Sequence, residues 1–143
     1  MKEMICTIFG TVGGFFVMLI GGTDAALLTM IILMAVDYIS GILVAGVFKN
    51  SPKTESGALE SKTGFKGLVK KGMCLLIVIV SARLDILMDT HYIRSAVITG
   101  FSLNELISIF ENAGLMGIPL PKVLLNAIEV LRNKADDRGE PDA

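Results

Sequence analysis

Long apolar runs with very few charges constrain this chain more than any other feature. No charged residue occurs in Met4–Ile20, and Ala25–Phe48 is interrupted by a single acid, Asp37. A shorter apolar run follows at Met73–Met88. A helix of about 20 apolar residues spans a hydrocarbon core of about 30 Å, so these runs are close to transmembrane helices in length and composition. The sequence therefore predicts an all-α integral membrane protein.

The overall composition supports this class. Hydrophobic residues make up 52% of the 143 residues and charged residues only 19%, whereas a soluble domain carries about 25% charged residues. The charges are concentrated in residues 49–71 and 132–143. The length suits one domain, 1–143, and the net charge of −1 provides no basic surface for nucleic acid.

The fourth segment, residues 93–118, is amphipathic. At helical spacing its polar residues share one face, with Glu105 at the edge of that face: Asn104, Ser108, Glu111 and Asn112. Such a helix spans a membrane only if its polar stripe is buried against protein or water; otherwise it lies in the interface. Both arrangements remain open. A short amphipathic helix is predicted at 121–134, followed by a charged tail at 135–143.

The distribution of basic residues predicts the topology. Residues 49–71 form a basic, Gly/Ser-rich connection with six lysines. Cytoplasmic loops near membrane spans collect lysine and arginine. Four crossings with both termini cytoplasmic place eleven of the thirteen basic residues inside, whereas three crossings move four of them outside. We therefore expect a bundle of about four transmembrane helices, with these lysines of the connection acting as topology determinants: Lys62, Lys66, Lys70 and Lys71.

The sequence offers no set of catalytic or metal-binding residues. The single histidine, His91, has no nucleophile and acid at a recognisable spacing. No phosphate-binding glycine loop, zinc-protease motif or CxxC pair occurs. Cys6 and Cys74 both lie in apolar runs, where we expect them to act as small hydrophobic residues. Neither an enzyme nor a cofactor is predicted.

Asp37 is the strongest single candidate for a functional residue. An ionised carboxylate at the centre of a bilayer costs roughly 3 kcal/mol, so it must be protonated, paired or hydrated. A pair with Arg83 of the neighbouring span and exposure to a polar lumen are both open. The residues expected to line a lumen or an assembly interface are Asp37, Arg83, Asn104, Glu105, Ser108, Glu111 and Asn112.

Small residues mark positions where helices can approach closely. Gly10 and Gly14 form a GxxxG pair in the first span, and Gly41 with Ala45 forms a similar pair in the second. A four-helix bundle of this size cannot enclose an aqueous path by itself, yet it buries acids. We therefore expect the chain to form a homo-oligomer.

Several sequence blocks resemble one known family. Asp37-Tyr38-Ile39-Ser40-Gly41, then Ser61-Lys62-Thr63-Gly64-Phe65-Lys66-Gly67, resemble segments of the phage holins related to the clostridial toxin-secretion proteins. Asn104-Glu105-Leu106-Ile107-Ser108-Ile109-Phe110-Glu111-Asn112 is the most specific block, and Gly117-Ile118-Pro119-Leu120-Pro121 with Leu124 extends it. The similar blocks lie in family order between residues 25 and 133.

The resemblance implies a holin, which accumulates in the bacterial cytoplasmic membrane and forms large lesions there. Such lesions release an endolysin, or in a few bacteria a toxin, without catalysis. The implied partners are the lipid bilayer and further copies of the chain, with endolysin as cargo rather than as a stable partner. The family's polar features fall on Asp37, Lys66, Asn104, Glu105, Ser108, Glu111 and Asn112.

Two other functions remain open from the residues alone. One is a small channel subunit for ions or metabolites, and the other is a membrane adaptor that docks a cytosolic partner. Met1 and Met4 also offer two possible starts, as in holins that make a longer inhibitor and a shorter effector.

Overall fold

The computed structural model describes residues 1–137. Within these residues the chain forms five α-helices and no strand, which confirms the all-helical prediction. The helices are α1 (Lys2–Leu19), α2 (Ala25–Gly46), α3 (Ser61–Met88), α4 (Ile93–Leu115) and α5 (Lys122–Asp137).

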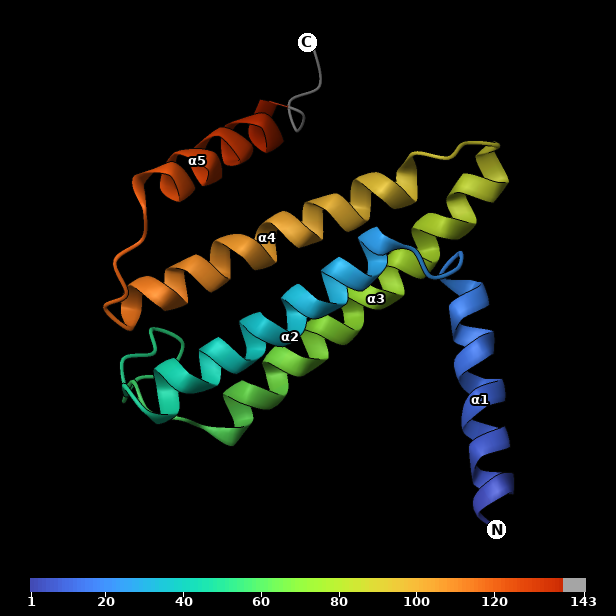
Figure 1. The fold of residues 1–143 in the computed structure, drawn as a ribbon, viewed down its shortest axis with the longest axis horizontal. Coiled ribbons are helices and arrows are strands. Elements are labelled where there is room, and N and C mark those ends of the chain that lie inside the picture. The colour runs from blue at the N-terminus through green and yellow to red at the C-terminus, as the bar shows by residue number, and fades with distance from the viewer. Residues whose placement is uncertain (138–143) are drawn as a thin grey trace.

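A bundle of α2, α3 and α4 forms the centre of the molecule (Figure 1). α2 and α4 run in the same direction and make the most extensive contact, while α3 runs the opposite way. α5 lies beside α4, and α1 turns away from the bundle. The connection between α2 and α3 therefore lies at one end of the bundle, and the α1–α2 and α3–α4 turns lie at the other.

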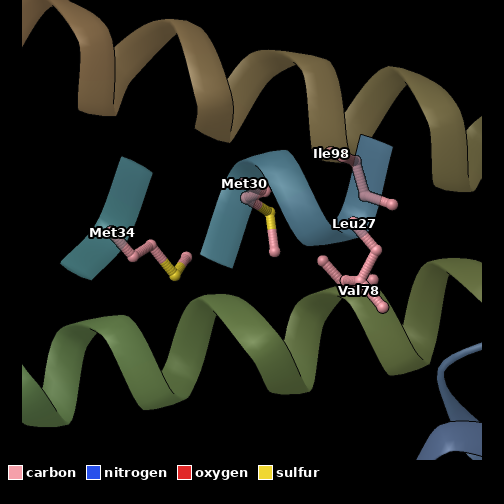
Figure 2. Packing of buried hydrophobic residues seen from close by; sticks show 5 residues of the cluster. All are labelled: Leu27, Met30, Met34, Val78 and Ile98. Carbon is pink, nitrogen blue, oxygen red and sulfur yellow. The ribbon is translucent and has the colours of Figure 1, made fainter. Parts of the chain in front are cut away.

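The bundle forms because α2 repeats buried residues every three or four positions, which places them on one helical face. They are Leu27, Met30, Met34, Asp37, Ser40, Val44 and Ala45. Figure 2 shows the apolar part of this face meeting one residue from α3 and one from α4. We call this group the apolar cluster: Leu27, Met30, Met34, Val78 and Ile98.

α1 is almost free of contacts within the chain. None of its residues is buried, and Phe9, for example, is 75% exposed. A Cβ atom added at Gly10 or Gly14 would meet nothing within 4 Å. The close helix approach expected at these glycines is therefore not made within one copy of the chain.

Three helices of the described residues, α1, α2 and α4, are long and apolar enough to cross a membrane. The apolar part of α3 is interrupted by Arg83 and Asp85 and preceded by Lys71, which is why α3 falls short by composition. Its 28 residues are nevertheless long enough, at about 42 Å, to cross a core of about 30 Å.

The predicted boundary of the basic connection was wrong. α3 begins at Ser61, so residues 61–71 are helical and the connection ends at residue 60. All four lysines expected in a loop lie on α3: Lys62, Lys66, Lys70 and Lys71. Glycines in this stretch suggested a loop, but each costs only about 1 kcal/mol within a helix, and packing against α2 outweighs that cost.

The other boundaries differ by a few residues. α4 ends at Leu115 rather than residue 118. α5 continues to Asp137, so the first part of the segment predicted as a tail is helical. The remainder of the predicted charged tail, 138–143, lies outside the described residues.

Candidate functional site

Three charged side chains, one from each helix of the central bundle, meet between α2, α3 and α4. The Lys71 ammonium donates hydrogen bonds to Oδ2 of Asp37 at 2.7 Å and to Oε2 of Glu105 at 2.5 Å. These side chains are 15%, 10% and 8% exposed, respectively. We call this group the charged triad, and it links the three helices through one ammonium group.

Asp37 is therefore paired, but the partner differs from the one expected. Arg83 is exposed and lies on the outer surface of α3. Lys71 instead lies on the inner face of α3, which continues through the buried residues Val78 and Asp85 at spacings of seven residues. The lysine thus occupies a core position of the helix, whereas Arg83 does not.

An amide and a hydroxyl extend the charged triad. Nδ2 of Asn112 donates to Oγ of Ser40 at 2.8 Å and to Oδ1 of Asp37 at 3.3 Å. The Ser40 hydroxyl also donates to the Asp37 carbonyl oxygen at 2.9 Å. The Asn112 amide also lies close to Gly41, since its nitrogen is 3.9 Å from where a Cβ of residue 41 would be. In the described part of the chain, every buried side-chain polar atom has a hydrogen-bond partner.

The charged triad lies near the middle of the bundle. Asp37 and Glu105 each occur twelve residues after the start of their helices, and these helices run in the same direction. Both carboxylates therefore lie about 18 Å along their helices. Two carboxylates and one ammonium carry one excess negative charge when all are ionised. Taking such charges out of water costs free energy, and the hydrogen bonds among these groups offset part of that cost.

A cavity of about 330 Å³ adjoins the charged triad. It is lined by all three triad residues, by Ser108 and Cys74, and by residues 51–54 of the connection. Tyr38 forms another part of the wall and lies against glycines of α3, since a Cβ added at Gly64 would be 3.5 Å from the Tyr38 hydroxyl.

The polar stripe predicted on α4 is divided between the interior and the surface. Asn112 is buried against α2, and so is Glu105, which the sequence placed only at the edge of the stripe. Ser108 is half-buried, while Asn104 and Glu111 are exposed. The inward face of α4 is thus centred on positions 105, 108 and 112. Gly41 and Ala45 lie opposite on α2, with Ala45 buried.

A second polar cluster joins the helix ends opposite the connection. The Arg94 guanidinium donates to the carbonyl oxygens of Ile20 and Gly22, at 2.6 and 3.0 Å, and to Oδ2 of Asp24 at 2.7 Å. This hydrogen bond from Arg94 lowers the pKa of Asp24, whose other carboxylate oxygen caps α2. Asp85 in turn accepts hydrogen bonds from the first backbone amides of α4.

The roles of Lys71 and Arg94 were missed by sequence reasoning. Both were counted only as charges that set topology. The signal for Lys71 was its place on the same helical face of α3 as Cys74, Val78 and Asp85. Nothing local marked Arg94, because its partners lie 70 or more residues away in the chain.

The apolar face of α4 is covered by α5. Between the two helices remains an apolar gap of about 170 Å³. It is lined by Leu103, Leu106, Ile107, Phe110, Leu124, Ala127 and Ile128.

These features define a class of protein. Long helices expose apolar side chains to their surroundings and gather charged groups in the interior, the reverse of a soluble fold and typical of a helical membrane protein. The model of the bacteriophage holin family matches residues 14–133, and the chain belongs to this family. It is not a family of enzymes.

Relatives support this assignment. The chain is 38% identical over 133 residues to an uncharacterized protein of Listeria innocua, covering 92% of this chain and 87% of the relative. It is 32% identical to an uncharacterized 14.9 kDa protein of Clostridium perfringens, covering 87% and 89%. A protein of Bacillus phage phi105 named "Probable holin" is 30% identical over 114 residues, covering 79% and 78%. No solved structure matches the chain.

Proposed function

We propose that this protein is a holin that assembles with copies of itself in the bacterial cytoplasmic membrane and forms lesions through which endolysin escapes. Family membership supports the proposal, and one structural observation carries it furthest. α1 is an apolar helix without a buried residue, so a single copy leaves a whole membrane-length helix free to contact lipid or another copy.

The proposed topology has four crossings, by α1 to α4, with both termini cytoplasmic. The charges of α3 are the main objection to its crossing. Two of them are compensated inside the protein, since Lys71 binds two carboxylates and Asp85 binds backbone amides. Arg83 lies less than two turns before the end of α3 at Met88. From there a long side chain can reach the membrane–water interface. α5 then lies on the cytoplasmic side.

The proposed assembly uses surfaces that the fold leaves free. Gly10 and Gly14 provide a small-residue surface on α1. Asn104 and Glu111 lie two turns apart on the exposed side of α4, so the same face presents both. This face would line the lesion or meet another copy, because a carboxylate facing lipid is unfavourable.

The proposed function is tested by expression in a bacterial host together with a cytosolic endolysin. A holin produces abrupt lysis at a defined time, and lysis requires the endolysin. A selective channel would change ion balance without releasing an enzyme, and an adaptor would do neither. Loss of viability without endolysin in the medium would therefore contradict the proposal. A toxin cargo is distinguished by coexpressing the toxin in place of the endolysin.

Gly14→Leu should reduce crosslinked oligomers and delay lysis. The added side chain separates backbones at a GxxxG surface, and it meets no atom of the same copy within 4 Å of its Cβ. The fold of one copy is therefore unaffected. The measurement is crosslinking in membranes beside the time of lysis.

Val12→Leu is the matched control, because it adds bulk on the opposite side of α1, where the side chain is 49% exposed. Equal oligomer yields in both variants and the unmodified protein would show that α1 packs only against lipid.

A further inference from the structure

Within residues 1–137, α1 is attached to the bundle only at its end. Every side chain from Lys2 to Met18 is exposed, and Leu19 and Ile20 are the first that are partly buried. Figure 1 shows the helix leaving the bundle from that end. The position of α1 relative to the bundle therefore depends on the short turn 20–24 rather than on packing along the helix.

The backbone of this turn requires glycine. Gly21 and Gly22 have φ angles of 89° and 90°, in the left-handed region that favours glycine. A Cβ added at Gly22 would meet nothing within 4 Å, whereas one added at Gly21 would lie 3.1 Å from Nε of Arg94. Because two consecutive glycines leave the backbone wide conformational freedom, the turn alone is a hinge, and the Arg94 side chain lies against it.

The Arg94 guanidinium binds both sides of this hinge. It donates to the carbonyl oxygen of Ile20, the C-cap of α1, to that of Gly22, and to the carboxylate of Asp24, the N-cap of α2. Its own backbone is held on α3, because Asp85 accepts a hydrogen bond from the Arg94 amide at 2.9 Å. The side chain is 12% exposed. A planar guanidinium with five N–H donors can bind such a set of acceptors at once.

We propose that Arg94 is a positioning residue, which holds α1 in one direction and so prepares it for assembly with other copies of the chain. This role rests on the function proposed above, because it concerns the step at which copies assemble. A helix that pivots freely loses that freedom when it packs against a neighbour, and the loss weakens association. A helix that is already held avoids most of this loss. Arg94 thus acts on the free surfaces of α1 through the turn.

The position of α1 is measured as the distance between two spin labels. One label is on native Cys6 of α1 and the other on Leu68→Cys of α3, in a Cys74→Ser background and in lipid nanodiscs that hold one copy each. Both sites are exposed and accept a label. We expect one narrow distance distribution with Arg94 present. In Arg94→Ala we expect it to broaden by about twofold or more, because the glycine hinge is released.

A second pair of labels reports on the bundle itself. Leu28→Cys, near the start of α2, is paired with Leu68→Cys in a background without native cysteines, and both positions are more than half exposed. This distance should stay narrow in Arg94→Ala. Arg83→Ala is the matched control for the distances, since it removes an exposed arginine near the same end of the bundle. It should leave both distributions unchanged.

Two milder variants separate the shape of the guanidinium from its charge. In Arg94→Lys the positive charge is kept, but a single nitrogen cannot bind Ile20, Gly22 and Asp24 together. We expect the α1 distance to be as broad as in Arg94→Ala. In Asp24→Asn the side chain still caps α2 but no longer forms an ion pair. We expect an intermediate width.

Assembly is measured by crosslinking in membranes, where Arg94→Ala and Arg94→Lys should lower the yield of oligomers several-fold. A narrow α1 distance in both variants would overturn the proposal, because the turn would then hold α1 without the guanidinium. An unchanged oligomer yield despite a broad α1 distance would overturn the role in assembly. A broadened bundle distance in all three variants would show that Arg94 only stabilises the fold. The distances are measured on single copies without lysis, so failure of the unmodified chain to release endolysin is recognised separately.

Discussion

Replacement of Lys71 by methionine should lower the free energy of unfolding of the central bundle by about 3 kcal/mol or more. The change keeps the length of the side chain but removes the ammonium group that binds Asp37 and Glu105. Two carboxylates then remain buried without a counter-charge, and removal of one partner of a buried ion pair is strongly destabilising. The measurement is reversible unfolding in detergent, together with abundance in the membrane fraction.

Lys70→Met is the matched control, because the neighbouring lysine is exposed and undergoes the same change of charge. We expect it to change stability by less than about 1 kcal/mol. A triple variant with Lys71→Met, Asp37→Asn and Glu105→Gln should recover most of the loss, since replacement of a whole buried ionic group by neutral side chains is often tolerated. Equal destabilisation by Lys70→Met would show that the charged triad contributes little.

The helices could be predicted from the sequence because their signal is local. Charge-poor stretches such as Ala25–Phe48 have a length and composition that only a membrane-length helix satisfies. The start of α3 could not be predicted in the same way. Lysines and glycines between residues 61 and 71 resemble a loop, and tertiary contacts, including Tyr38 against Gly64 and Lys71 with Glu105, stabilise them as a helix.

The candidate site was only partly predictable for a related reason. The need of Asp37 for a partner follows from the energetics of a buried carboxylate, so a pair was expected. The identity of that partner depends on how α2 and α3 are rotated against each other. Arg83 and Lys71 both lie on α3, and the one local signal that favours Lys71 is its place on the face of α3 that carries Val78. Likewise, periodicity grouped the polar residues of α4 but left open which side of the group faces inward.

Glu111→Leu should abolish timed lysis while the protein still reaches the membrane in normal amounts. Glu111 is exposed on α4, so its replacement breaks no contact within the bundle and raises apolarity. If this face lines the lesion or contacts another copy, the variant loses the polar group that assembly requires. The measurement is endolysin-dependent lysis alongside membrane abundance, with Glu111→Gln as the polar control that should retain lysis.

Asn112→Leu, at the adjacent position, should lower the abundance of the protein in the membrane, whereas Glu111→Leu should not. The two variants together therefore separate an effect on folding from an effect on assembly. The Asn112 amide is buried and donates hydrogen bonds to Ser40 and Asp37, and loss of such a partner costs about 1–3 kcal/mol. We expect reduced abundance in the membrane and a delay in lysis that follows from it.

Normal lysis by Glu111→Leu at normal abundance would contradict a role in the lesion, because the exposed face of α4 would then only contact solvent or lipid headgroups. Equal loss of abundance in both variants would instead contradict the division of α4 into an inward face at Asn112 and a free face at Glu111.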